Sequence, residues 1–399
     1  MGKGGRKPMK PVEISLPEPR TKASSPPAVP RVLFLLSGPI HEISATLRLT
    51  MERLSEAFEG TIVTTMPNPI QARIGRFRLL CLNTRARHRF FLYFKYMCYA
   101  LGLAIHGRVT GKKWDLVATY DPMRTGMMGL LTARLAGARF TPEVNGVYDS
   151  YANYLDIRQD IFTRIRKWLY PHWVHFVLRQ ADGIKILFPK QLARFLAPGS
   201  RQVVSSFFAY VDLSPFRDLG EKKEVLFVGF PFWLKGVDIL IAAFKRVATR
   251  HPDWKLKIMG WYPDMTELDK HMGGHPQIFH HPPVLHSRMH MHIGSCGIFV
   301  LPSRTEAMGR VLLEAMAASK PRIGSDVDGI PTVIDDWVDG LLFRCGNVDD
   351  LAAKLDLLMG DPKLRKSLGS RGRERAEREF TSDAYFSKLI GFYRRVLCQ

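Results

Sequence analysis

Short apolar runs alternate with longer amphipathic segments along most of the chain, and this alternation starts twice. The first set of apolar runs falls at 31–36, 61–65, 114–120, 139–144 and 183–188. The second set falls at 225–228, 255–259, 297–301, 322–324 and 340–343, with one more short run at 278–281. Apolar strands separated by helices are typical of parallel sheets that helices cover on both faces. The sequence therefore predicts two α/β domains.

The chain of 399 residues is longer than one hydrophobic core usually supports. The polar stretch at 217–223 separates the two sets of strands. We expect a disordered, basic, proline-rich tail at 1–30, an N-terminal domain at 31–215, a C-terminal domain at 216–378 and a final helix at 379–399. The tail has no apolar stretch of the kind found in secretory signals. Two such domains imply a cleft between the carboxyl ends of their sheets, where ligands of these folds bind.

The charge is strongly positive and unevenly distributed. Residues 1–220 hold 32 Lys and Arg against 15 Asp and Glu, a net charge of +17, whereas residues 221–399 hold 26 against 22, a net charge of +4. A positive charge of this size attracts nucleic acid, anionic lipid or acidic glycan. The sign of the charge alone does not distinguish among these partners. The five cysteines are scattered and lack C-x-x-C spacing, which favours a reducing, cytoplasmic compartment.

The most informative motif is PSRTEAMGRVLLEAMA, which follows a predicted strand and opens a helix. Its glycine, Gly309, lets the backbone approach a ligand, and the N–H groups of Gly309, Arg310 and Val311 lie at the helix N-terminus. Such a terminus attracts phosphate through its free donors and its dipole. Glu306 precedes the turn and could accept hydrogen bonds from sugar hydroxyls, while Glu314 in the helix could hold a ribose diol.

Residues 302–334 closely resemble the signature of the family-4 retaining glycosyltransferases of GT-B fold, also described as glycosyl transferases group 1. The resemblance continues through GFPFWLKGVDILI at 229–241 and DGLLF at 339–343. It is strong over about 220–360 and extends to the N-terminal half only in layout. It implies two Rossmann-like domains facing across a cleft, with C-terminal helices that return to the N-terminal domain.

The resemblance also implies roles for individual residues. Glu306 matches the family's sugar-contacting carboxylate, Glu314 its ribose-binding carboxylate and Lys235 its pyrophosphate-binding lysine. Gly38 matches a glycine loop at the cleft, and Val284 lies where the family packs the base. The implied reaction moves a sugar from a UDP- or GDP-sugar to a glycan or lipid-linked acceptor, with retention and without a metal or other cofactor. Synthesis of cell-surface polysaccharide is the expected setting.

Two residues depart from the family pattern. Phe230 stands where the family usually has a phosphate-binding arginine, and Arg310 in the phosphate-facing turn could substitute for it. Asn145, within the segment 143–146, stands where the family often presents a histidine; it could donate a hydrogen bond but cannot carry a proton. These departures leave open a catalytically impaired, nucleotide-sugar-binding protein. A glycoside hydrolase is a poorer alternative, because Glu306 and Glu314 belong to one turn and its helix.

Two other patterns are compatible with a metal site. Asp326 and Asp328 have the D-x-D form, although they lie in a loop of the family signature. Seven of the 13 histidines fall within 271–292, and His286 and His290 are one helical turn apart. The D-x-D pair matches a loop of the family signature, and no carboxylate or cysteine cluster completes the histidine set. We therefore expect no metal.

Basic residues lie next to aromatic residues in two N-terminal segments. The basic residues of these segments are Arg73, Arg76, Arg78, Arg85, Arg87 and Arg89, followed by Arg164, Arg166 and Lys167. They adjoin Phe90 to Tyr96 and Trp168, Tyr170 and Trp173. An anionic membrane surface, a solvated basic face and a nucleic-acid surface all fit this pattern. Since the sequence has no recognised nucleic-acid-binding module, we expect peripheral membrane contact rather than nucleic acid.

Overall fold

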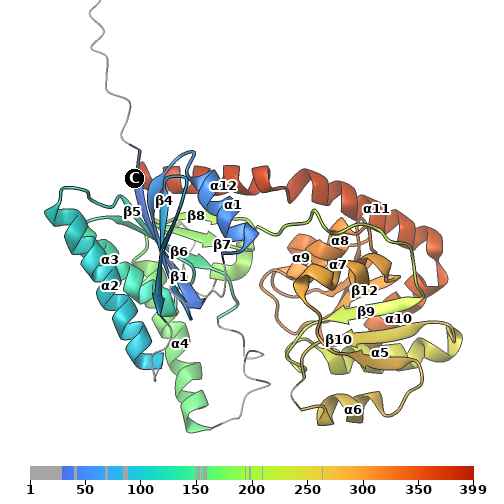
Figure 1. Ribbon diagram of the computed structural model, residues 1–399. Coiled ribbons are helices and arrows are strands. Elements are labelled where there is room, and N and C mark those ends of the chain that lie inside the picture. The colour runs from blue at the N-terminus through green and yellow to red at the C-terminus, as the bar shows by residue number, and fades with distance from the viewer. Residues whose placement is uncertain are drawn as a thin grey trace, which may run out of the picture.

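The computed structural model describes residues 29–39, 43–67, 71–83, 89–148, 150, 153, 155, 160–193, 195–196, 199–208, 210–262 and 264–399. Nearly all of the tail expected at 1–30 lies outside these residues. Figure 1 shows two α/β domains side by side, with the last two helices running from the C-terminal domain back over the N-terminal one. None of the described helices is long and apolar enough to cross a bilayer.

The N-terminal domain is built on an eight-stranded sheet of order β3-β4-β2-β1-β5-β6-β7-β8. All neighbouring strands are parallel except β3, which is antiparallel to β4. The strands are β1 (Arg31–Pro39), β2 (Glu59–Met66), β3 (Gln71–Ile74), β4 (Phe77–Asn83), β5 (Leu116–Thr119), β6 (Arg139–Val144), β7 (Gly183–Ile186) and β8 (Val203–Ser206). The helices are α1 (Ala45–Leu54), α2 (Arg89–Val109), α3 (Arg124–Ala136) and α4 (Ile161–Arg179), with a 3-10 turn η2 at Pro189–Leu192.

Successive residues of a strand point to opposite faces of its sheet, and β1 shows this in the core. Leu33 and Leu35 pack with α2, α3 and α4. Val32 and Phe34 pack on the other face with α1 and the final helix α12 (Ser382–Leu397). Burial on both faces explains why the strand is almost entirely apolar.

The C-terminal domain is built on a six-stranded, wholly parallel sheet of order β11-β10-β9-β12-β13-β14. Its strands are β9 (Glu224–Val228), β10 (Lys255–Met259), β11 (Ile278–His281), β12 (Ile298–Leu301), β13 (Arg322–Ser325) and β14 (Leu341–Phe343). Its helices are α5 (Val237–Val247), η3 (Ala248–Arg250), α6 (Thr266–Met272), α7 (His286–Ser295), α8 (Arg310–Ala317), α9 (Ile330–Val333), α10 (Val348–Gly360) and α11 (Pro362–Glu379). The strand order is that of the Rossmann fold, and its direction reverses between β9 and β12.

The structure confirms all eleven strands expected from the apolar runs and adds β3, β4 and β8. It also confirms the returning helix, because Phe386, Phe392 and Tyr393 of α12 are buried in the N-terminal core. The chain crosses between the domains twice, through the segment between β8 and β9 and at the junction of α11 and α12.

Candidate active site in the interdomain cleft

The carboxyl ends of both sheets open into one cleft. A cavity of about 660 Å³ between the domains is lined by Val147 and Gln191 from the N-terminal side and by Arg304, Asp328 and Thr332 from the C-terminal side. In the C-terminal sheet the strand order reverses between β9 and β12, so the loops after these two strands lie at the point where such folds bind ligands.

Lys235 and Glu306 come from these two loops and form an ion pair, with 2.6 Å between Nζ and Oε2. Their side chains are 20% and 15% exposed, so both can still be reached from the cleft. The loops touch at Gly236, whose φ is 67° and where an added Cβ would lie 2.0 Å from the carbonyl oxygen of Pro302. Only glycine allows that approach without strain.

Two further contacts hold the loop that carries Glu306. The Arg304 guanidinium donates to both carboxylate oxygens of Asp238 on α5, at 2.8 and 2.6 Å, and to the carbonyl of Trp233. Asp328 accepts a hydrogen bond from the backbone N–H of Glu306 at 3.2 Å and another from the Thr305 hydroxyl. These contacts fix the backbone of the loop at Glu306 before any ligand binds.

The helix α8 starts in the same loop. Its N-cap is Gly309, in a left-handed conformation with φ 67° and ψ 52°. Arg310 and Val311 are its first residues, and the side chain of Val311 packs partly buried against the domain core. The first N–H groups of a helix lack intrahelical acceptors, and the helix dipole makes this end attractive to anions.

Glu314 lies one turn into α8, with a side chain only 2% exposed. One of its oxygens, Oε1, contacts Nε2 of His286 at 3.0 Å and accepts a hydrogen bond from Nε of Arg310 at 3.2 Å. The sequence singled out Glu314 and Arg310 but not the bond to His286, the first residue of α7, which precedes β12 in the chain. Among the described residues, these side-chain contacts of Glu314 all involve Oε1, which leaves Oε2 able to accept a hydrogen bond from a ligand.

Three other residues predicted from the sequence, Val284, Phe230 and Gly38, differ in burial and in what they contact. Val284 lies between β11 and α7, two residues before His286, and is half-buried against the core. Phe230 is half-exposed and packs against the rings of Trp261 and Tyr262, so an aromatic cluster occupies the place of the family's arginine. Gly38 is the second-last residue of β1, and residues 40–42 that follow the strand lie outside the described ranges.

Asn145 lies on the N-terminal side of the cleft, directly after β6. Its amide nitrogen donates to the carbonyl oxygen of Tyr120 at 2.7 Å and to Glu143 at 3.3 Å. Its oxygen is buried and accepts no hydrogen bond from the residues that the structure describes. The sequence predicts that Asn145 donates a hydrogen bond to the sugar. In the structure its amide nitrogen already donates to Tyr120 and Glu143, and its side-chain oxygen is the atom without a partner among the described residues.

Electrostatic effects connect the two sides of the cleft. Burial and the charge of Glu143 raise the pKa of Tyr120, while the positive charge of Arg310 acts to lower that pKa across the cleft. Glu143 is itself paired with Lys185, which is fully buried, at 2.9 Å. Arg310, which contacts Glu314, is therefore close enough to the N-terminal domain for its charge to act on Tyr120.

The two patterns considered for a metal serve other purposes in the structure. Asp326 accepts a hydrogen bond from the backbone N–H of Cys345 at 2.7 Å, and Asp328 holds the Glu306 loop as described above. These contacts fit the loop interpretation. Within the described ranges, no group of three or more His, Cys, Asp or Glu side chains is arranged to hold a metal ion.

The structure separates the basic residues that the sequence places together in the segment 73–96. Arg73, Arg76 and Arg78 belong to the β3–β4 hairpin, and β4 starts level with Gly60, at the amino end of the sheet. Helix α2 starts only after β4 has crossed the sheet, so its first residues lie at the opposite, carboxyl end. Arg85 and Arg87 lie outside the described residues.

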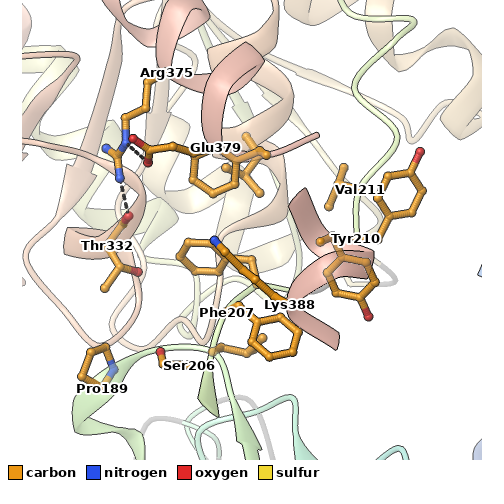
Figure 2. Close-up of a pocket in the computed structure, with 14 residues that line it drawn as sticks. Pro189, Ser206, Phe207, Tyr210, Val211, Thr332, Arg375, Glu379 and Lys388 are labelled. Atoms are coloured by element: carbon orange, nitrogen blue, oxygen red, sulfur yellow. Dashed lines mark hydrogen bonds and ion pairs between the residues drawn. The ribbon is translucent and has the colours of Figure 1, made fainter. Parts of the chain in front are cut away.

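A second cavity, of about 240 Å³, lies where the chain crosses between the domains (Figure 2). It is lined by Phe207 and Tyr210 of the first crossing and by Arg375 and Glu379 of α11. Arg375 bonds Glu379 at 2.9 Å and the carbonyl of Thr332 at 2.8 Å. The cavity is thus bounded by both connections on which the domains can pivot.

Comparison with known proteins relates the C-terminal part of the chain to a family. Residues 215–375 match the family model described as glycosyl transferases group 1. An uncharacterized glycosyltransferase of Methanocaldococcus jannaschii is 33% identical over 159 residues, which cover 39% of this chain and 43% of that protein. The chain thus spans less than half the length of this curated relative.

Two solved structures share the fold over nearly their whole length. Sucrose-phosphate synthase from Thermosynechococcus elongatus superposes with a TM-score of 0.74 at 18% identity, over 92% of this chain and 99% of that one. Anabaena HepE, solved in complex with UDP-glucose, gives a TM-score of 0.65 at 14% identity, over 90% and 98%. The chain has the GT-B fold, and its residues 215–375 match the model of glycosyl transferases group 1.

Proposed function

We propose that the protein is a glycosyltransferase that moves a sugar from a nucleoside-diphosphate sugar to a glycan or lipid-linked acceptor. The observation that carries this proposal is the Lys235–Glu306 pair beside the N-terminus of α8, with Glu314 buried in the same helix. A cation, a carboxylate and a helix N-terminus together suit the phosphates, the sugar hydroxyls and the ribose of such a donor. The UDP-glucose bound to Anabaena HepE supports a nucleotide-sugar donor for this fold.

The ion pair suggests how donor binding prepares the site. When the diphosphate enters, Lys235 exchanges its contact with Glu306 for the phosphates, and the freed carboxylate can accept hydrogen bonds from the sugar. As the sugar leaves, negative charge grows on the diphosphate next to Lys235 and the helix N-terminus, which stabilises the transition state. The leaving phosphate then takes the proton of the acceptor, so transfer proceeds with retention and without a catalytic metal.

A thermal-shift screen with UDP, GDP, ADP and their sugars tests donor binding. We expect at least one nucleotide and its sugars to raise the melting temperature of the protein, and we expect this rise to shrink in Lys235→Ala but not in the exposed control Lys270→Ala. If none of these nucleotides binds, the proposal fails. Binding without turnover would instead favour an impaired, nucleotide-sugar-binding protein, an alternative motivated by Phe230 and by the occupied donors of Asn145.

We also propose that α4 contacts the cytoplasmic face of an anionic membrane, where a lipid-linked acceptor would lie. Ile161, Ile165 and Trp168 are spaced to form one helical stripe and are 61%, 50% and 67% exposed. Arg164 and Arg166 flank the stripe, and each well-placed basic residue contributes on the order of 1 kcal/mol at an anionic surface. In Figure 1 the first half of α4 projects beyond the sheet.

Vesicle sedimentation tests this surface. Ile165→Ser combined with Trp168→Ser should weaken binding to phosphatidylglycerol-containing vesicles, because the change removes the apolar part of the stripe and leaves its charge. The matched control, Leu219→Ser with Leu357→Ser, removes two exposed leucines elsewhere. Equal binding of both variants would contradict a role for α4.

A further inference from the structure

A second basic site lies at the amino end of the N-terminal sheet, away from the cleft. It is a cavity of about 710 Å³ lined by Arg31 of β1, Arg73 and Arg78 of the β3–β4 hairpin, Arg76 of its turn, and Lys112. The cleft lies at the carboxyl end of the same strands. Since β1 has nine residues at about 3.3 Å each, the two ends are roughly 25–30 Å apart. The proposed transfer reaction makes no use of this cavity.

The arginines of the hairpin are placed where they repel one another. Arg73 and Arg78 are direct cross-strand partners in the antiparallel register, and like charges in that position are destabilising. Glu59 is the one acidic residue that lines the cavity, and it is paired with Arg31 at 3.2 Å. Arg73, Arg76, Arg78 and Lys112 form no ion pair with an acidic side chain of the described ranges. The cavity therefore holds positive charge that the described part of the chain does not neutralise.

Several of these groups are held in place without a ligand. The Arg31 guanidinium lies 4.5 Å from the ring centre of Trp114 and donates to the carbonyl oxygens of Lys112 and Lys113. Arg78 donates to the side-chain oxygen of Gln71 at 3.0 Å. The turn is fixed by the backbone N–H of Arg76, which donates to the Ser55 hydroxyl at 2.9 Å. Guanidinium groups fixed in this way are suited to bidentate contacts with phosphate.

We propose that this cavity binds an anion that carries two or more phosphate groups. Four cations that have no acidic partner among the described residues exceed what one phosphate needs. Several phosphates would also offset the repulsion between Arg73 and Arg78. The phosphates could belong to a soluble compound or to the headgroups of anionic lipids. Either source would make this a binding site separate from the donor site.

The test compares Arg73→Gln/Arg76→Gln/Arg78→Gln with a control triple variant on α11, Lys363→Gln/Lys366→Gln/Arg371→Gln, which removes the same charge elsewhere. Both are made in a Lys235→Ala background, so that the donor-site lysine does not contribute. Titration calorimetry with inorganic tripolyphosphate should show a loss of affinity of at least about tenfold in the hairpin variant but not in the control. In low salt without anion, the hairpin variant should melt no lower than its parent, because repulsion is removed.

Binding experiments with two kinds of vesicle identify the source of the phosphates. If the hairpin variant also loses binding to phosphatidylglycerol-containing vesicles, and none binds to phosphatidylcholine alone, lipid headgroups are the ligand. If only tripolyphosphate binding is lost, the ligand is soluble. If the hairpin variant and the control bind tripolyphosphate and vesicles equally, the proposal is overturned. None of these readouts depends on sugar transfer, so they stand apart from the proposed function.

Discussion

Glu306 and Glu314 are eight positions apart in one loop and its helix, yet their surroundings give them different capacities. Glu306 is paired with Lys235 and can be reached from the cleft. Glu314 is buried and held at one oxygen by His286 and Arg310. A carboxylate fixed in this way can bind a ligand group without reorganisation, whereas Glu306 must first release its lysine.

This difference predicts separate effects of the two substitutions. Glu314→Ala should weaken nucleoside-diphosphate binding by about 1–3 kcal/mol, because charge-assisted hydrogen bonds to the ribose are lost. Glu306→Ala should leave that affinity nearly unchanged and lower turnover, because its partner is the sugar. Calorimetry with the free nucleotide and kinetics with its sugar measure the two quantities. Equal losses of nucleotide affinity in both variants would refute the division of roles.

At the scale of elements, a buried ionic network joins β13, the turn before β14 and α11. Arg322 is fully buried and donates to Asp339 at 2.9 Å, while Arg375 of α11 bonds the other Asp339 oxygen at 2.8 Å. Burial lowers the pKa of Arg322 to about 10, although Asp339 favours its charged form. Because α11 leads into the second crossing, the network fixes the helix that returns to the N-terminal domain.

Removing the shared carboxylate should therefore destabilise the C-terminal domain. Asp339→Ala leaves a buried arginine without its counter-charge, and such a loss costs about 3–5 kcal/mol. The exposed pair Arg373–Glu377 on α11 provides the control, since Glu377→Ala should cost at most about 1 kcal/mol. Urea unfolding followed by circular dichroism measures both values. Similar midpoints for the two variants would mean that Arg322 is not dependent on Asp339.

The elements also show what could be predicted from the sequence. The eleven expected strands are apolar because they are buried, mostly on both faces, which makes them visible as runs. The β3–β4 hairpin was missed because Arg73, Arg76 and Arg78 interrupt the apolar pattern on its exposed face. Strand β8 was missed because its sequence, VVSS, has only two apolar residues and is not fully buried. Two local sequence motifs were enough to predict Lys235, Glu306 and Glu314 as site residues. The bond of Glu314 to His286 joins two helices 28 residues apart, which no local pattern records.

At the scale of the whole molecule, the two domains can pivot only where the chain crosses between them. The cavity there is bounded by rings of both crossings, including Phe208 and Phe380 at 5.5 Å and Tyr210 and Tyr385 at 6.0 Å between centres. Closure of the cleft over a donor would change the shape of this cavity and exclude water from the transfer step.

Filling the cavity of about 240 Å³ at the two crossings, which we call the hinge cavity, should restrict closure of the cleft. Lys388 lines the cavity from α12 and is exposed, so Lys388→Trp can occupy the space without disturbing the core. We expect lower turnover with nearly unchanged nucleotide affinity, because the predicted nucleotide contacts lie within the C-terminal domain. Small-angle scattering with and without nucleotide, alongside kinetics, measures both effects. Lys388→Ala is the control, and normal turnover together with normal compaction in Lys388→Trp would contradict this role of the hinge.

We propose that the cleft transfers sugar from a nucleotide donor held by Lys235, Glu306 and Glu314. The most direct measurement is a proton NMR time course of the protein with the nucleotide sugar that binds best, which follows donor consumption and the anomeric form of the sugar first released. We expect the wild type to consume the donor and to release sugar with the donor's own configuration. We expect almost no turnover by Lys235→Ala, while Lys270→Ala should behave as wild type. Release of sugar with inverted configuration, or full turnover by Lys235→Ala, would contradict the proposed transfer reaction.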